Sequence, residues 1–134
     1  MKKILAIISL FVLTFFCNAQ NNTYQLSSHI LDLSTGNPAK NVSVTLQKMN
    51  KDKLWKIIST NNTDENGRIN NLLPSQNNNE GIYKLVFDTH PYFENKNIDS
   101  FYPFVEVVFT IKGQEHFHVP ITISPFGYST YRGN

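Results

Sequence analysis

Apolar residues recur at every second position along most of the chain. Residues 42–47, 105–111 and 116–124 show this alternation, with Val108 as its exception. A period of two is typical of β-strands that bury one face, because successive side chains point to opposite faces of a sheet. Shorter strands are predicted over residues 26–33, 54–61, 68–72 and 82–88.

Turn-forming residues separate these runs at positions 35–38, 50–52, 64–67 and 112–113. The polar residues 75–80 predict an exposed loop. One short helix is predicted where Thr89 can act as N-cap and Pro91 falls in the first turn, and it should end near Lys96. About seven or eight strands with one short helix indicate an all-β fold, a two-sheet β-sandwich that forms one domain over residues 26–134.

The first residues have the composition of an export signal. Two lysines precede an apolar run that ends at Phe16, and Ala19 supplies a small residue at the expected cleavage position. Residues 1–19 are therefore predicted to be a signal peptide, and the apolar run is too short for a membrane-spanning helix. The predicted location is the bacterial periplasm, and residues 20–25 are expected to form a flexible N-terminus. An N-terminal anchor and a lipoprotein attached through Cys17 are the alternatives.

Charge and cysteine content exclude two classes of function for the remaining domain. The chain has 12 basic and 10 acidic residues, and removal of the two lysines of the signal leaves ten of each. A nearly neutral domain lacks the clustered basic surface that nucleic-acid binding requires. The single cysteine, Cys17, also lies in the signal, so the domain has neither a disulfide nor a thiolate nucleophile.

Two histidines share one face of the predicted strand at residues 116–124. His116 and His118 fall on its polar side, while Phe117 and Val119 begin the side that supplies the core. Histidine gains and loses a proton near neutral pH, as a group that activates water must do. Taken alone, the pair is more simply interpreted as solvated surface residues. The spacing would also allow a metal site, but the cysteines and nearby carboxylates of a familiar zinc motif are missing.

Residues 116–134, with the sequence HFHVPITISPFGYSTYRGN, resemble the closing signature of the transthyretin-like hydroxyisourate hydrolases, which end in Tyr-Arg-Gly-Ser. Further matches occur in order: SHILD at residues 28–32, GNPA at 36–39 and TDENGR at 63–68. The resemblance thus covers nearly all of the predicted domain. The chain departs from the pattern at its last position, where Asn134 replaces serine, a change that bears on activity more than on the fold.

The resemblance implies a transthyretin-like sandwich that opens the ring of 5-hydroxyisourate, a step of urate degradation, without a metal or other cofactor. The predicted catalytic residues are His29, Arg68 and His118, and the predicted substrate-binding residues are Tyr131, Arg132, Gly133 and Asn134. His116 matches the motif and is expected to be a neighbour of the catalytic position. Members of the family form tetramers around a channel, with active sites at subunit contacts, so a homotetramer is expected here.

The three predicted catalytic side chains suit this chemistry. Ring opening adds water to a carbonyl carbon and expels a ring nitrogen, so one neutral imidazole can take a proton from water while another holds or returns a proton. Arg68 can stabilise charge on the carbonyl oxygen, and beside a histidine it should favour the neutral imidazole. The sequence leaves open which of His29 and His118 is the base.

The alternative function is binding without catalysis, by a transthyretin-like carrier or a generic exported β-sandwich. The turn at residues 36–42 also occurs in exported adhesive sandwiches, so it does not separate the two classes. In the transthyretin carrier, other residues occupy the positions of His29, Arg68 and His118. The presence of all three therefore favours the enzyme.

Overall fold

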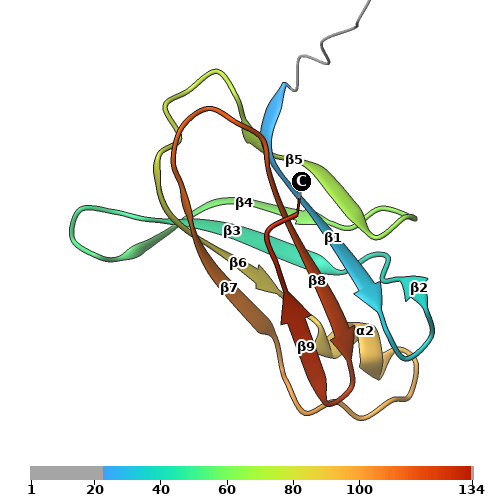
Figure 1. Ribbon diagram of the computed structural model, residues 1–134. Helices are drawn as coiled ribbons and strands as arrows, with labels where there is room; N and C mark the ends of the chain where they lie inside the picture. Colours follow the sequence, from blue (N-terminus) through green and yellow to red (C-terminus); the bar gives the residue numbers. More distant parts are fainter. Residues whose placement is uncertain (1–22, 134) are drawn as a thin grey trace, which may run out of the picture.

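Alternating burial along the chain produces two β-sheets that pack face to face (Figure 1). The computed structural model describes residues 23–133; the predicted signal peptide, residues 1–19, and Asn134 lie outside the described part. The elements in chain order are β1 (Tyr24–Asp32), β2 (Asn37–Pro38), β3 (Ser43–Met49), β4 (Trp55–Asn62), β5 (Arg68–Pro74), β6 (Gly81–Phe87), α2 (His90–Glu94), β7 (Val105–Ile111), β8 (Phe117–Ser124) and β9 (Gly127–Thr130). The predicted all-β sandwich with one short helix is confirmed.

Strand β1 lies inside the sheet that carries the predicted site. That sheet has the order β2-β1-β8-β9, with β5 also paired to β1, and the second sheet has the order β4-β3-β6-β7. β1 and β8 run parallel, whereas the other pairings between the named strands are antiparallel. The first and last long strands of the described chain are therefore neighbours, and Figure 1 shows the C-terminus returning beside them.

The core lies between the two sheets and follows the predicted alternation. The first sheet contributes Leu26, Ile30, Phe117, Val119 and Ile121, and the second contributes Val44, Leu46, Leu85 and Phe87. Each large apolar side chain buried in this way contributes about 1.5–3 kcal/mol to folding. Val108, the exception in the pattern of β7, is 56% exposed, so the extra apolar residue points outward and leaves the alternation of the strand intact.

The structure corrects the sequence prediction at the N-terminus. Residues 20–25 are predicted to be flexible, but β1 already begins at Tyr24. Gln25 is 1% exposed, its Nε2 donates to the Gly113 carbonyl at 2.9 Å, and its Oε1 accepts from Asn79. Asn79 is likewise buried, although it belongs to the predicted exposed loop at residues 75–80. These polar side chains can be buried because they are hydrogen-bonded. A hydrophobic pattern in the sequence does not detect burial of this kind.

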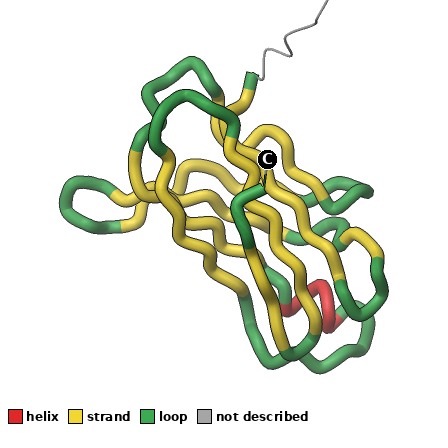
Figure 2. The backbone as a smooth tube through the Cα atoms, in the orientation of Figure 1, coloured by secondary structure: helices red, strands yellow, loops and turns green. Residues whose placement is uncertain are grey.

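β9 and the helix differ from expectation in smaller ways. β9 is not among the predicted strands because its four residues lack apolar alternation, and it forms by pairing with β8. The predicted helix is present as α2 at one end of the sandwich (Figure 2), with Pro91 in its first turn. Thr89 makes no side-chain capping bond, and its backbone is already helical at φ −85° and ψ −21°. Within residues 23–133, no helix is long and apolar enough to cross a membrane.

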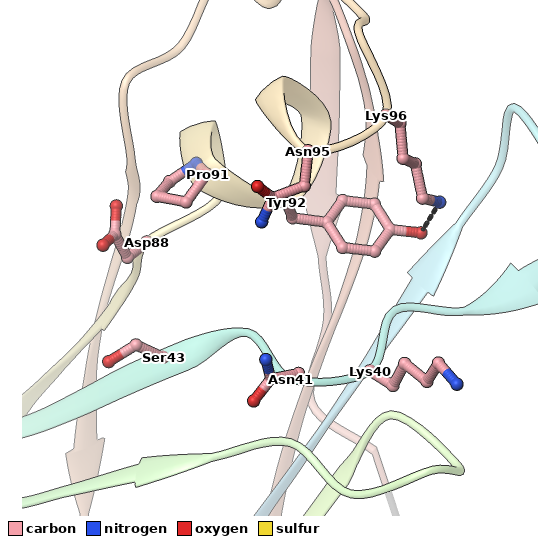
Figure 3. A pocket seen from close by; sticks show the side chains of 8 residues that line it. All are labelled: Lys40, Asn41, Ser43, Asp88, Pro91, Tyr92, Asn95 and Lys96. Carbon is pink, nitrogen blue, oxygen red and sulfur yellow. Dashed lines mark hydrogen bonds between the residues drawn. The ribbon is translucent and has the colours of Figure 1, made fainter.

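Helix α2 anchors the end of β1 through Asp32, whose side chain is 0% exposed. The Tyr92 hydroxyl donates to the Asp32 carboxylate at 2.9 Å, and the Lys96 ammonium lies 3.3 Å from the same oxygen. Figure 3 shows Tyr92 and Lys96 hydrogen-bonded to each other beside a cavity of about 260 Å³ between α2 and the start of β3. Burial alone would raise the pKa of Asp32, but hydrogen bonds from Ser34, Tyr92 and Lys96 lower it overall. The Asp32 carboxylate is thus charged, and its hydrogen bonds hold the end of β1, the strand that carries His29.

Gly67 lets the turn before β5 lie directly against β1. Its φ of +68° is in the left-handed region, and the Ile30 amide donates to its carbonyl at 2.9 Å. A Cβ on Gly67 would lie 2.6 Å from the Ile30 carbonyl oxygen, closer than van der Waals contact allows. This close approach brings Arg68, the next residue, beside β1.

We expect Gly67→Ala to destabilise the fold by about 2–5 kcal/mol, because left-handed backbone costs about 1–2 kcal/mol and overpacking adds about 1–3 kcal/mol. Gly36→Ala is the matched control: Gly36 has a φ of +70°, but nothing lies within 4 Å of its Cβ position. Only the backbone cost should apply there. Denaturant unfolding measures both, and equal losses in the two variants would contradict the role given to the Gly67–Ile30 contact.

Candidate active site

The three predicted catalytic residues lie together on the outer face of the first sheet. In the β1–β5 pairing His29 is opposite Arg68, and in the parallel β1–β8 pairing Ser27 is opposite His118. Both imidazoles are half-buried, whereas Arg68 is exposed. Strand register therefore joins side chains from three distant parts of the chain into one cluster.

Burial and charge favour the neutral form of both imidazoles. Burial lowers the pKa of His29 from its usual 6.5, and the Arg68 guanidinium lowers it further, against smaller opposing effects from the turn at residues 64–66. Burial, followed by the same guanidinium, also lowers the pKa of His118, with further contributions from the other two nearby histidines. Both rings are therefore available as proton acceptors at neutral pH.

A hydrogen-bonded chain supports the His118 ring. Its Nδ1 lies 2.8 Å from the Ser27 hydroxyl, which is also 2.8 Å from Nε2 of His116. The other ring nitrogen of His116, Nδ1, lies 3.1 Å from the Tyr24 carbonyl oxygen. Ser27 is absent from the residues predicted from the sequence, because only the parallel register places it between the two histidines. The signal that the sequence offers for Ser27 is its position two residues before His29, on the same face of β1.

Gly133 packs against another edge of the His118 ring. The two residues form an antiparallel bridge, in which the Gly133 amide donates to the His118 carbonyl at 2.9 Å. A Cβ on Gly133 would lie 2.6 Å from Cδ2 of the ring. A glycine is needed for so close an approach, and the C-terminal segment therefore restricts the ring on this side.

The side chains of Tyr131 and Arg132 do not join the histidine cluster. Tyr131 is 62% exposed, while Arg132 pairs with Glu115 and lies over Phe117, with its guanidinium carbon 5.1 Å from the ring centroid. Both residues line a groove of about 260 Å³ between β7 and the C-terminal segment. Among the predicted substrate-binding residues that the structure describes, Gly133 is the one that joins the histidine cluster. Asn134 lies outside the described part.

Two neutral imidazoles beside a guanidinium can move protons and stabilise negative charge on the same substrate. The imidazoles accept or return protons, and the guanidinium donates hydrogen bonds to a developing oxyanion. In the described part of the chain, no three His, Cys, Asp or Glu side chains are grouped closely enough to hold a metal ion. The chemistry that the cluster itself supports is acid–base hydrolysis.

Arg68→Gln should raise the pKa of both His29 and His118, because the guanidinium charge disfavours protonation of each ring. NMR titration of the histidine ring protons measures the change. Arg132→Gln is the matched control, because it removes a guanidinium that pairs with Glu115 instead. Histidine pKa values that stay the same in Arg68→Gln would contradict this electrostatic coupling.

The chain matches a known family and several known proteins. Residues 26–133 match the HIUase/Transthyretin family. A 5-hydroxyisourate hydrolase of Salmonella dublin is 47% identical over 110 residues, covering 81% of this chain and 80% of the relative. A "Probable 5-hydroxyisourate hydrolase" of Caenorhabditis elegans is 45% identical over 113 residues, covering 84% of this chain and 83% of the relative.

The fold has close counterparts among solved structures as well. The crystal structure of transthyretin from Sparus aurata superposes with a TM-score of 0.77 at 34% identity, covering 81% of this chain and 96% of that one. The family match spans the β-sandwich from Leu26 in β1 to Gly133 in the C-terminal segment. The chain therefore belongs to the HIUase/transthyretin family.

Proposed function

We propose that this protein hydrolyses 5-hydroxyisourate, and that His29, Arg68 and His118 carry the reaction. The observation that carries the proposal is the arrangement of two half-buried imidazoles, both with lowered pKa, and a guanidinium on one sheet face. The relatives from Salmonella dublin and Caenorhabditis elegans carry this activity in their names at 47% and 45% identity. Their substrate is the one that we assign to this chain.

Hydrolysis opens the ring by adding water to a carbonyl carbon and breaking the bond from that carbon to a ring nitrogen. One neutral imidazole accepts a proton from water as the C–O bond forms, and the resulting imidazolium returns a proton to the leaving nitrogen as the C–N bond breaks. Arg68 donates to the carbonyl oxygen while negative charge develops there. The lowered pKa values of His29 and His118 keep the proton-accepting forms populated to lower pH.

Binding without catalysis is the alternative function. Sea bream transthyretin, which shares the fold, forms a crystalline complex with thyroxine. Its identity to this chain is 34%, against 47% and 45% for the two hydrolases. A carrier also has no need of two histidines that share one arginine, so hydrolysis accounts better for the cluster.

We also propose that the protein acts as a homotetramer with sites at subunit contacts. Apolar side chains follow His29 along the chain: Leu31 in β1 is half-buried, and Leu33, directly after β1, is 59% exposed. Phe126 and Tyr131, near the C-terminus, are 72% and 62% exposed. Apolar surface of this kind is typical of interfaces, and a partner chain there would exclude bulk water and strengthen the electrostatic effect of Arg68.

Export to the bacterial periplasm is proposed from the sequence alone. The two N-terminal lysines, the apolar run that ends at Phe16 and the small residue Ala19 support a cleaved signal. These residues lie outside the described part of the chain. The hydrolase would then act on substrate that reaches the periplasm.

Replacement of His118 by Asn should lower the rate of hydrolysis by about a hundred- to ten-thousand-fold, the usual contribution of a general acid–base group. The fold should persist, because the side chain lies on the outer face. His90→Asn is the matched control, since His90 lies at the start of α2 and its Nδ1 is 3.1 Å from Ser100. The assay follows the ultraviolet absorbance of freshly generated 5-hydroxyisourate, corrected for spontaneous decay. A folded His118→Asn protein with near wild-type turnover would remove this assignment.

Light scattering on the purified protein should give the mass of four chains. With 15.4 kDa per full-length chain, a tetramer weighs about 62 kDa before removal of any signal. Dilution that dissociates the assembly should also abolish activity, because the sites are expected at subunit contacts. A fully active monomer would contradict the proposed assembly.

A further inference from the structure

The hydrogen-bonded chain that supports His118 has a direction, and the proposed reaction depends on it. We infer that the Tyr24 carbonyl, His116 and Ser27 act as positioning groups that fix the tautomer of His118, so that its Nε2 presents a lone pair to the attacking water. This inference rests on the proposed function. It adds two side chains to the proposed site, and it assigns the role of base to His118.

The backbone carbonyl of Tyr24 sets the donor–acceptor direction of this series of hydrogen bonds. A carbonyl oxygen only accepts hydrogen bonds, so Nδ1 of His116, 3.1 Å away, carries a proton and donates it. A neutral imidazole with its proton on Nδ1 has an acceptor at Nε2. The Ser27 hydroxyl, 2.8 Å from that Nε2, therefore donates its single proton to His116.

Ser27 in turn determines which partner donates in its hydrogen bond with His118. Since its proton is given to His116, its oxygen accepts from Nδ1 of His118 at 2.8 Å. His118 thus carries its proton on Nδ1 and its lone pair on Nε2.

Packing holds the ring in the orientation that this chain needs. Ser27 is 6% exposed, and the next residue, Ser28, donates from its hydroxyl to the Val119 carbonyl at 2.8 Å, which ties β1 to β8. Gly133 packs against Cδ2 on the edge of the His118 ring. A flip of the ring would exchange Nδ1 with Cδ2 and break the bond to Ser27, so this hydrogen bond favours the observed orientation, while Gly133 limits the space beside the ring.

The fixed tautomer matters because only a lone pair can remove a proton from water. If Nε2 carried the proton, His118 would meet the water with a donor and could not act as the base. When Nε2 takes the proton, the imidazolium keeps its Nδ1–H bond to Ser27, and no group has to reorganise in the transition state. Ser27 and His116 thereby act on the reaction through His118 without touching the substrate.

The tautomer can be observed directly by ¹⁵N NMR of protein labelled at histidine, at a pH well above the ordinary histidine pKa of about 6.5. The ring nitrogens of His118, assigned by their loss in His118→Asn, should show a protonated Nδ1 and an unprotonated Nε2. In Ser27→Ala the single tautomer should give way to a mixture. A wild-type His118 with its proton on Nε2 would overturn the inference.

The kinetic test separates positioning from a purely structural role. Ser27→Ala and His116→Phe should each lower kcat by about 10- to 100-fold with little change in KM, as for other groups that orient a functional histidine. Ser27→Thr keeps the hydroxyl and should restore kcat. Ser129→Ala is the matched control, because it removes a hydroxyl that bonds Thr122 at 2.8 Å on the same sheet but belongs to no histidine chain.

The outcomes of these tests distinguish the inference from the function on which it rests. Wild-type kcat in both Ser27→Ala and His116→Phe would overturn the positioning role, and so would a Ser27→Thr protein as slow as Ser27→Ala. Should Ser27→Ala fail to fold, the half-buried His116 still provides the test. A wild-type protein that leaves the decay of 5-hydroxyisourate unchanged would instead overturn the proposed function, whatever the tautomer of His118.

Discussion

Strands β1 and β8 run parallel over seven residue pairs, and both faces of their sheet depend on that pairing. On the inner face it buries Leu26 and Ile30 in the same cluster as Phe117. On the outer face the same register sets Ser27 beside His118 and brings His29 two positions further along. A slip of one residue would turn the core side chains outward and the histidines inward. The free energy of burying the core therefore also enforces the geometry of the site.

The position of the cluster on a sheet face, rather than in the core, sets its electrostatics. Half-burial lowers the pKa of His29 and His118, while the exposed Arg68 remains solvated and still acts on both rings. A shift of one pKa unit corresponds to about 1.4 kcal/mol, so a single neighbouring charge can bias a histidine towards its neutral form. A fully buried guanidinium would incur a desolvation penalty of several kcal/mol for the same effect. The sheet face thus combines neutral bases with a cation at little cost to stability.

The sequence predicted what depends on local pattern and missed what depends on pairing. Alternation located most strands because each inward residue is apolar, and the family motifs brought together His29, Arg68 and His118. Ser27 has no such signal, since its place between two histidines follows from a parallel register with a strand about 90 residues away. Burial of Gln25 depends on hydrogen bonds and β9 depends on its partner strand, so neither leaves a hydrophobic pattern. The hydrogen bonds of Gln25 join residues far apart in the chain, whereas β9 pairs with β8, the strand directly before it.

The C-terminal segment shows why neighbouring residues in a motif need not share a task. Consecutive residues of an extended chain point to opposite sides. Gly133 faces His118, and Arg132 accordingly turns away towards Glu115 and Phe117.

One extended segment therefore restricts the His118 ring with one residue and lines the groove beside β7 with the residues before it. In the proposed homotetramer, a subunit packed over that groove would press on the same segment that holds Gly133 against His118. Assembly would then support catalysis in two ways, by excluding water from the cluster and by fixing the backbone on which the orientation of the His118 ring depends.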